Sequence, residues 1–177
     1  MNVLKYDDQL TDHWRVSELC RPDDWPLLQA DEHLQEHLRA LAVTILEPLR
    51  VLAGHPLICI SGYRSPAHNA SVNGVKQSQH MLANAADITP EGVEWQNLRA
   101  HFLRHAGFEE FTPKMADDQE MVRQLDLLAE HHLSSELGAV GGIGWYPNSG
   151  WLHLDRRLRG PNGHVARWTG SDFGSES

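Results

Sequence analysis

The stretch SGYRSPAHNASVNGVKQSQHMLANAADI, residues 61–88, decides how this sequence is interpreted. It contains one arginine, two histidines, one aspartate and five alanines, and it shows neither the repeat of a single helix nor the alternation of a single strand. The remainder of the chain limits what kind of site such a segment can form.

Length and composition set the first limits. The 177 residues are enough for one domain with a substantial core and too few for two ordinary domains, so we expect a single domain over residues 1–177. There are 24 acidic residues against 15 Lys and Arg, a formal charge of −9, which argues against a nucleic-acid partner. With only Cys20 and Cys59 available, a disulfide framework is not expected.

The N-terminal residues do not show the pattern of a signal peptide. MNVLKYDDQLTDHW has no basic start followed by an apolar run, so we expect no signal peptide and synthesis in the cytoplasm. No apolar stretch approaches the ~20 residues that a membrane-spanning helix needs. We expect residues 1–13 and 170–177 to be loosely ordered tails, and the protein to be a monomer.

Apolar periodicity predicts three helices. Segment 31–54 has apolar residues at steps of three and four, with Pro48 expected to kink the helix and Gly54 to end it. Segment 91–107 is expected to be a second helix closed by its final glycine. A third is expected over 116–133, where acidic residues occupy the first turn and interact favourably with the helix dipole.

Three short segments predict strands. LICIS, residues 57–61, is typical of a short buried strand. GGIGWYP at 141–147 and WLHLD at 151–155 predict two more, and the intervening Asn148, Ser149 and Gly150 suit a hairpin turn.

Two motifs outside residues 61–88 are better explained by structure than by chemistry. His101 and His105 share a helical face, but a helical zinc-protease motif needs Glu where this chain has Phe102, so a solvated face is preferred. GAVGGIG at 138–144 leads into WYP rather than into a helix, and so lacks the context of a dinucleotide-binding loop.

Three residues form a candidate metal set. His80 and Asp87, separated by six residues, supply an imidazole and a carboxylate, and His153 supplies a second imidazole. If 151–155 is a strand, His153 and Asp155 share one face while the two leucines share the other. Two histidines and a carboxylate with an open fourth position form a known catalytic zinc set. Considered singly, each histidine is equally well explained by hydrogen bonding in or near the core.

The quoted segment, together with the later GGIGWYPNSGWLHLD, resembles the zinc D-Ala-D-Ala carboxypeptidase and murein endopeptidase family. That family includes the vancomycin-resistance D,D-dipeptidases and has Hedgehog signalling domains as fold relatives. The matching pieces are SGYRSP, SQH, AAD and the later segment, and the resemblance extends from about Trp14 to Trp168. It implies Zn²⁺ bound by His80, Asp87 and His153. It also implies an α+β domain whose small, mostly antiparallel sheet carries the zinc site and is flanked by helices.

The resemblance further implies hydrolysis of amide bonds in peptidoglycan stem peptides, of the D,D-carboxypeptidase or murein endopeptidase type. Arg64 would stabilise the developing oxyanion. Ser78 and Tyr63 are candidates for substrate contact, and a loop serine and a partly buried tyrosine are the structural alternatives. A phage-type lysin or a virion-borne murein peptidase would fit the absence of a signal peptide.

Two positions depart from the family pattern. Ala83 stands where the family usually has glycine, so we expect backbone strain there. Gly150 stands where some members carry an acidic general base. Asp155 is the replacement that the HxD pattern favours, and the alternative is an aspartate that orients His153 or pairs with a neighbouring arginine. A zinc-containing binding module that has lost hydrolysis is therefore the competing function.

Segment 112–139 lies between the second and third ligands and is longer than that connection needs. It is either a lid over the groove or a packed surface helix. The apolar stripe of Met121, Leu125 and Leu128 favours the packed helix.

Overall fold

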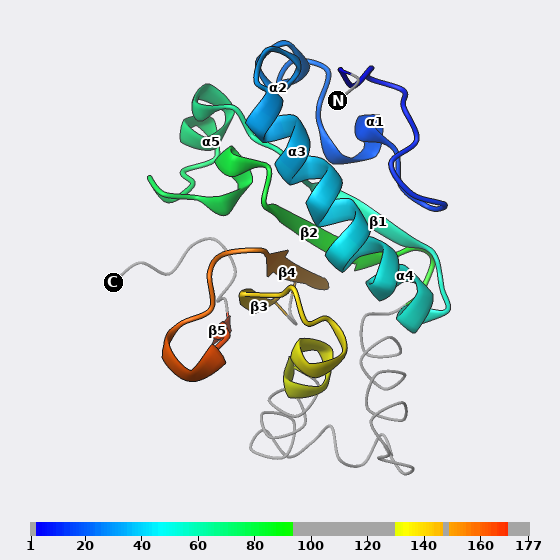
Figure 1. Ribbon diagram of the computed structural model, residues 1–177, viewed down its shortest axis with the longest axis vertical. Helices are drawn as coiled ribbons and strands as arrows, with labels where there is room; N and C mark the ends of the chain where they lie inside the picture. Colours follow the sequence, from blue (N-terminus) through cyan, green and yellow to red (C-terminus); the bar gives the residue numbers. More distant parts are fainter. Residues whose placement is uncertain (1–2, 94–129, 147–148, 170–177) are drawn as a thin grey trace.

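A five-stranded sheet forms the centre of the computed structural model, which describes residues 3–93, 130–146 and 149–169 (Figure 1). The strands occur in the order β1-β2-β4-β3-β5, with three antiparallel pairings and a parallel pairing of β3 with β5. Their bounds are Leu57–Ser61 (β1), Ala85–Pro90 (β2), Gly142–Tyr146 (β3), Trp151–Asp155 (β4) and Ala166–Thr169 (β5). This mostly antiparallel sheet with helices packed against it confirms the predicted α+β fold.

Helices cover one face and one end of the first half of the sheet. In Figure 1, α3 and α4 cross the face formed by β1 and β2, while α1, α2 and α5 lie towards one end. The α-helices are Val16–Leu19 (α1), Trp25–Ala30 (α2), Glu32–Leu41 (α3), Glu47–Ala53 (α4) and Pro66–Ser71 (α5), and a further helix covers 130–136. Among the described residues, 3₁₀ turns span Gln79–Leu82 and Pro161–Gly163.

The long helix expected over 31–54 is present but interrupted. Asp31 caps α3 by accepting hydrogen bonds from the backbone N–H groups of His33 and Leu34. A π-helical turn, Ala42–Leu46, separates α3 from α4 and lies immediately before Pro48, which has no N–H to continue the regular ladder. Gly54 ends α4 in the left-handed conformation, with φ +57°, as predicted.

The β3–β4 hairpin is also confirmed. The two strands pair from Gly142 opposite Asp155 to Tyr146 opposite Trp151. Gly150 has φ +72°, and its N–H donates to the carbonyl of Tyr146 at 2.9 Å. Glycine adopts this positive φ at no steric cost, which explains why the turn ends in this residue.

β1 differs from the buried strand that was predicted. It lies at the edge of the sheet, and the side chains of Ile58 and Ile60 are 44% and 51% exposed. Only alternate residues of β1 face the core, so its apolar run reflects an edge strand with one exposed apolar face.

The expectation of a loose N-terminal tail is wrong for residues 3–13. Leu4 is buried, and its backbone N–H donates to the Gln35 side chain at 2.7 Å. The Tyr6 hydroxyl donates to the carbonyl of Cys20 at 3.1 Å. These contacts with α3 and with the end of α1 hold the segment against the core.

Several expected elements fall largely or wholly outside the described residues: the helix over 91–107 with His101 and His105, most of the helix over 116–133, and the tail 170–177. Residues 91–93, which are described, form a bend and not the start of a helix. Within segment 112–139, the described helix over 130–136 packs into the core through Leu133, and Leu137 just beyond it is also buried. This part of the segment is therefore a packed helix.

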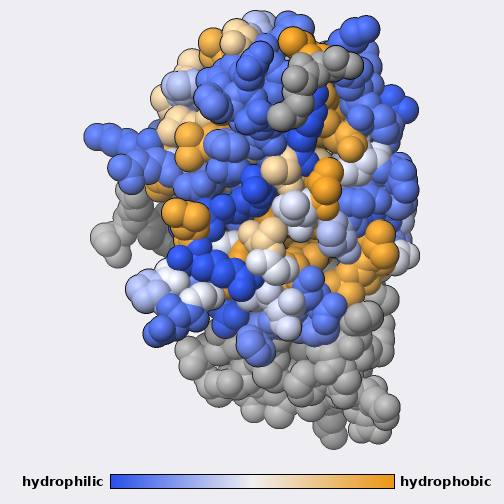
Figure 2. All heavy atoms as spheres, in the orientation of Figure 1, coloured by the Kyte–Doolittle hydropathy of each residue, from blue (hydrophilic) through white to orange (hydrophobic). Residues whose placement is uncertain are grey.

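The face of the molecule in Figure 2 is mainly hydrophilic, and its hydrophobic residues occur in small separate groups. Exposed apolar side chains of the helices include Leu27, Val43 and Val51. No helix among the described residues combines the length and apolarity needed to cross a bilayer.

A buried carboxylate joins the N-terminal helices to α5. Asp24 is 3% exposed and accepts hydrogen bonds from the Ser65 backbone N–H at 3.2 Å and from His68 Nδ1 at 2.6 Å. Burial alone would raise the pKa of Asp24, but the hydrogen bonds from Ser65 and His68 outweigh it and lower that pKa.

We predict that Asp24→Asn lowers the free energy of unfolding by about 2–3 kcal/mol at pH 7, because an amide is a weaker acceptor for both donors. Because the pKa of Asp24 is lower in the folded state than in the unfolded state, its ionised form stabilises the fold above the unfolded-state pKa, near pH ~4. This stabilisation is lost as the pH falls through the folded-state pKa. The difference between wild type and variant, measured by denaturant titration, should therefore shrink below pH ~4. Asp23→Asn at the exposed neighbouring position is the control, and equal losses from both variants would contradict the assignment.

Candidate metal centre

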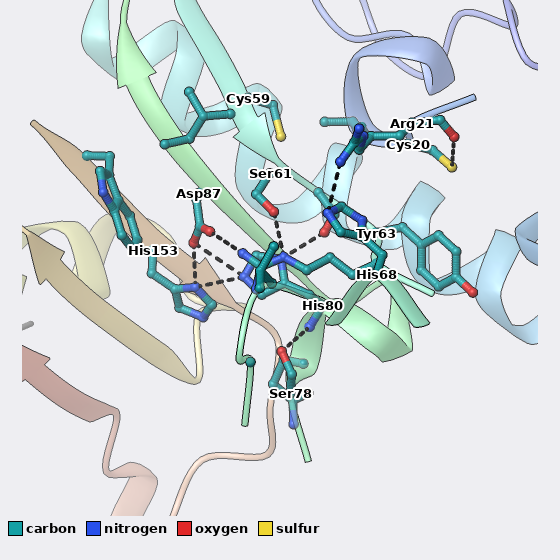
Figure 3. Close-up of a pocket in the computed structure, with 18 of the residues that line it drawn as sticks. Cys20, Arg21, Cys59, Ser61, Tyr63, His68, Ser78, His80, Asp87 and His153 are labelled. Carbon is teal, nitrogen blue, oxygen red and sulfur yellow. Dashed lines mark hydrogen bonds and ion pairs between the residues drawn. The ribbon is translucent and has the colours of Figure 1, made fainter. Parts of the chain in front are cut away.

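Three side chains predicted as metal ligands converge at one point (Figure 3). His80 comes from the 3₁₀ turn before β2, Asp87 from β2 and His153 from β4. Asp87 and His153 lie directly opposite each other in the β2–β4 pairing. All three side chains are buried, so the cluster is a formed site rather than a chance grouping of surface residues.

The spacing of the ligand atoms fits a small tetrahedral ion. His80 Nε2 lies 3.2 Å from His153 Nδ1 and 3.3 Å from Asp87 Oδ1, and His153 Nδ1 lies 2.8 Å from the same carboxylate oxygen. Tetrahedral zinc with bonds of about 2.0–2.2 Å places its ligand atoms about 3.3–3.6 Å apart. The two separations from His80 Nε2 are close to this range, and the shorter one between His153 Nδ1 and Asp87 Oδ1 is a hydrogen bond that would lengthen around an ion.

Each ligand is oriented by a second group that holds its other polar atom. His80 Nδ1 donates to the carbonyl of Gly62 at 2.7 Å, and His153 Nε2 contacts Asp155 Oδ2 at 3.1 Å. Arg64 Nη2 donates to Asp87 Oδ2 at 2.8 Å. Such partners select the tautomer and orientation of metal ligands, and they leave His80 Nε2, His153 Nδ1 and Asp87 Oδ1 for the ion.

Residues 61–88 fold into a compact connection between two antiparallel strands. A bulge in β1 between Cys59 and Ser61 brings Ser61 opposite Asp87. A Cβ at Gly62 would lie 2.1 Å from the carbonyl oxygen of Leu19, so glycine alone lets the chain pass this close to α1. The backbone N–H of Arg64 then donates to the carbonyl of His80 at 3.1 Å, which ties the start of the connection to the first ligand.

The strain expected at Ala83 is present. Ala83 closes the 3₁₀ turn that carries His80, in the left-handed conformation with φ +53° and ψ 26°. Its N–H donates to the carbonyls of Gln79 and His80, so a backbone geometry that glycine adopts more easily is retained here with an alanine.

A cleft of about 950 Å³ opens at the metal centre. His80, Asp87 and His153 contribute to its wall, as do Arg64, Tyr63 and Ser78, which we predicted from the sequence.

Tyr63 and Ser78 also have evident structural roles. Ser78 Oγ accepts the backbone N–H of His80 and so caps the turn that carries this ligand. Tyr63 is 3% exposed, and burial, with the nearby Asp24 and Cys20, raises its pKa to about 12. Substrate contact by these two residues stays a prediction.

Arg64 holds a ligand and also faces the cleft. Its Nε donates to Ser61 Oγ at 2.7 Å and its Nη2 to Asp87. Nη1 has no hydrogen-bond partner among the residues that the structure describes. The predicted role at an oxyanion is therefore compatible with the geometry, and it stays a prediction.

Asp155 is fully buried beneath His153 and does not line the cleft. Besides His153 Nε2, it accepts hydrogen bonds from the backbone N–H of Arg157 at 3.0 Å and from the Arg157 guanidinium. Burial alone would raise the pKa of Asp155, but these donors lower it to about 2. Of the two roles left open by the sequence, this geometry favours the carboxylate that orients His153.

The ligands' own pKa values reflect the same contacts. Burial would raise the pKa of Asp87, but hydrogen bonds with His153 and His80 lower it well below its usual range. Burial lowers the pKa of His80. The pKa of His153 is raised despite burial, because Asp155 and Asp87 both stabilise its protonated form.

The glycines of GGIG, residues 141–144, make room for Asp155 and Trp168, which pack around His153. A Cβ at Gly142 would lie 2.5 Å from Asp155 Oδ2, and one at Gly144 would lie 2.5 Å from the indole of Trp168. Residues 142–144 of this segment belong to strand β3, and the two glycines among them are required by packing.

Trp168 is a site residue that sequence reasoning missed. Its ring lies 5.2 Å from the His153 ring between centroids, and the guanidinium of Arg157 lies 5.0 Å from its centroid. Its indole N–H donates to the Tyr146 hydroxyl at 2.9 Å. No periodic pattern marks β5, so the only available signal was the cluster of small residues in β3 that leaves space for this ring.

Comparison with known families agrees with this geometry. A family model described as Peptidase M15 matches residues 24–122, which is more than half of the chain. The chain belongs to the peptidase M15 family. The matched range contains His80 and Asp87, and His153 joins them from β4, beyond that range. A search of curated proteins found no match.

Membership confirms the family resemblance and supports a zinc metallopeptidase. The His–Asp–His cluster supplies the donor set that a zinc peptidase needs, from residues that the structure brings together independently of the match.

We predict that Gly144→Ala displaces Trp168 and weakens zinc binding roughly tenfold or more, the range seen when groups supporting a metal ligand are lost. The Cβ would meet a rigid ring, which must move away from His153. Zinc affinity would be measured by competition with a chelator. Gly138→Ala is the matched control, because a Cβ there has no atom within 4 Å. Unchanged affinity in the Gly144 variant would show that Trp168 does not support the site.

Proposed function

We propose that this protein is a zinc peptidase that hydrolyses amide bonds in the peptide stems of peptidoglycan. The observation that carries the proposal is the convergence of three buried candidate ligand atoms, close enough together to bind one ion, at the wall of an open cleft. A closed structural site would use a fourth protein ligand, whereas three ligands facing a cleft leave a position for chemistry. The resemblance of residues 61–88 and 141–155 to murein peptidases supports stem peptides as the substrate class.

Zinc bound here would act as a Lewis acid on the scissile carbonyl and would activate the attacking water. The protein's contribution is to hold three ligand atoms in place before the ion or the substrate arrives. His80 is fixed by a backbone carbonyl, His153 by Asp155 and Asp87 by Arg64. Each of these hydrogen bonds reduces the rearrangement of side chains that zinc binding would otherwise require.

Arg64 is our candidate for stabilising charge in the reaction, in addition to its contact with Asp87. Two of its nitrogens are held by Ser61 and Asp87, so the guanidinium plane is fixed in the cleft wall. We propose that Nη1 stabilises the charge that develops on the carbonyl oxygen, since a preorganised cation is most effective in a site with little water.

The Asp155–Arg157 pair contacts His153 on the side away from the other two candidate ligands. Asp155 fixes His153 with Nδ1 towards the ligand cluster and Nε2 towards itself, and Arg157 fixes Asp155. We propose that Asp155 acts by orienting His153, because it is fully buried and lies outside the cleft lining.

Hydrolysis and metal dependence can be tested together. We predict about one zinc per chain in the purified protein. The protein should release new amino groups from purified sacculi and from synthetic stem peptides, a chelator should stop the reaction, and added zinc should restore it. His80→Ala should lose both zinc and activity, whereas His33→Ala at an exposed position should keep both. If the zinc-loaded protein binds sacculi but cuts no stem bond across a broad peptide panel, the binding module becomes the correct function.

Asp155→Asn separates the two roles of this carboxylate. If Asp155 orients His153, the amide should weaken zinc binding about 10–100-fold, and activity measured at saturating zinc should recover in large part. The measurements are zinc affinity by chelator competition and turnover as a function of free zinc. Full zinc affinity with turnover reduced a hundredfold or more would instead identify Asp155 as the general base.

A further inference from the structure

A second polar cluster, formed by Arg21, His68 and the buried Asp24, borders the cleft. Arg21 and His68 both line the cleft, and Figure 3 shows them beside each other, linked by a dashed line, apart from the three metal ligands. Arg21 Nη1 lies 3.1 Å from His68 Nε2, and His68 Nδ1 lies 2.6 Å from Asp24 Oδ2. The mechanism described above uses none of these residues.

The contacts define the direction of each hydrogen bond. A guanidinium can only donate, so His68 Nε2 accepts from Arg21 and the ring carries its proton on Nδ1. That proton is donated to Asp24, which is itself buried and fixed by the Ser65 backbone N–H. Asp24 therefore orients the imidazole, and the imidazole positions the guanidinium at the cleft.

Arg21 differs from the other two arginines of the cleft. Arg64 is paired with Asp87 and Arg157 with Asp155. Arg21 is exposed, and within the described part of the chain no carboxylate lies within ion-pair distance of it. Glu18, another acid of the cleft lining, accepts the backbone N–H of Arg15. Arg21 thus presents a positioned cation whose donors beyond the His68 contact are available for an anion.

We propose that Arg21 binds a free carboxylate of the substrate, away from the bond that is cut, with His68 as its positioning residue. A planar guanidinium matches a carboxylate with two parallel hydrogen bonds, which gives orientation as well as affinity. The inference rests on the proposed peptidase function and narrows its substrate class to acidic peptides. The carboxylate can be the C-terminal one or one carried by a residue within the peptide.

The test uses two matched pairs of stem peptides. In one pair the C-terminus is a free acid or an amide, and in the other an internal carboxylate is kept or converted to its carboxamide. Zinc-loaded wild type should prefer the acid in one of the pairs by about tenfold or more in kcat/KM, because a charge-assisted hydrogen bond is lost with the amide. The pair that shows the preference identifies which carboxylate is bound.

Variants assign that preference to the cluster. Arg21→Gln should reduce it to less than about twofold, mainly by raising KM for the acid, while zinc content and hydrolysis of the amide stay unchanged. His68→Ala should also reduce it. His68→Gln should retain much of it, because a carboxamide can accept from Arg21 and donate to Asp24. Arg15→Gln, an exposed arginine outside the cleft lining, is the control.

Two results would overturn the inference: equal kcat/KM for acid and amide in both pairs, or an unchanged acid preference in Arg21→Gln. If no peptide is hydrolysed, the proposed function fails separately, and calorimetric affinities for the same peptides decide the inference. Tighter binding of an acid that disappears in Arg21→Gln would support the carboxylate subsite, and equal binding of acid and amide would reject it.

Discussion

The antiparallel pairing of β2 with β4 is the constraint on which the site depends. It places Asp87 opposite His153, so two candidate ligands meet without either having to reach across the cleft. In a strand, a slip of one residue moves every side chain to the other face. The buried Ile88, Leu152 and Leu154 oppose such a slip, because it would bring these side chains towards the site face. The hydrophobic core therefore maintains the register that holds the candidate metal centre together.

The second requirement is that the polar atoms buried around the ligands be satisfied. Charged groups are costly to bury unless each has a partner, and here Arg64 pairs with Asp87 and Arg157 with Asp155. The glycines of β3 supply the space in which this second layer packs, with Trp168 covering His153. The glycine-rich strand, the arginine–aspartate pairs and the metal ligands are thus parts of one arrangement.

Much of this arrangement could be predicted because its signals are local in sequence. The amphipathic helix ending at Gly54 and the β3–β4 hairpin follow from periodicity and turn residues. The three ligands needed the family resemblance, since each histidine alone had an ordinary explanation.

β2 was not predicted as a strand because it is short and ends in Pro90, a residue that argues against a strand in the sheet interior, although β2 lies there with nearly all its residues buried. The Arg21–His68–Asp24 cluster was missed because His68 lies more than forty residues along the chain from both of its partners.

X-ray absorption spectroscopy of the zinc-loaded protein tests most directly the central claim that His80, Asp87 and His153 bind zinc. The account predicts two imidazole nitrogens and one or two oxygens at about 2.0–2.2 Å with no sulfur ligand. A sulfur shell at about 2.3 Å, or a spectrum without imidazole, would contradict it.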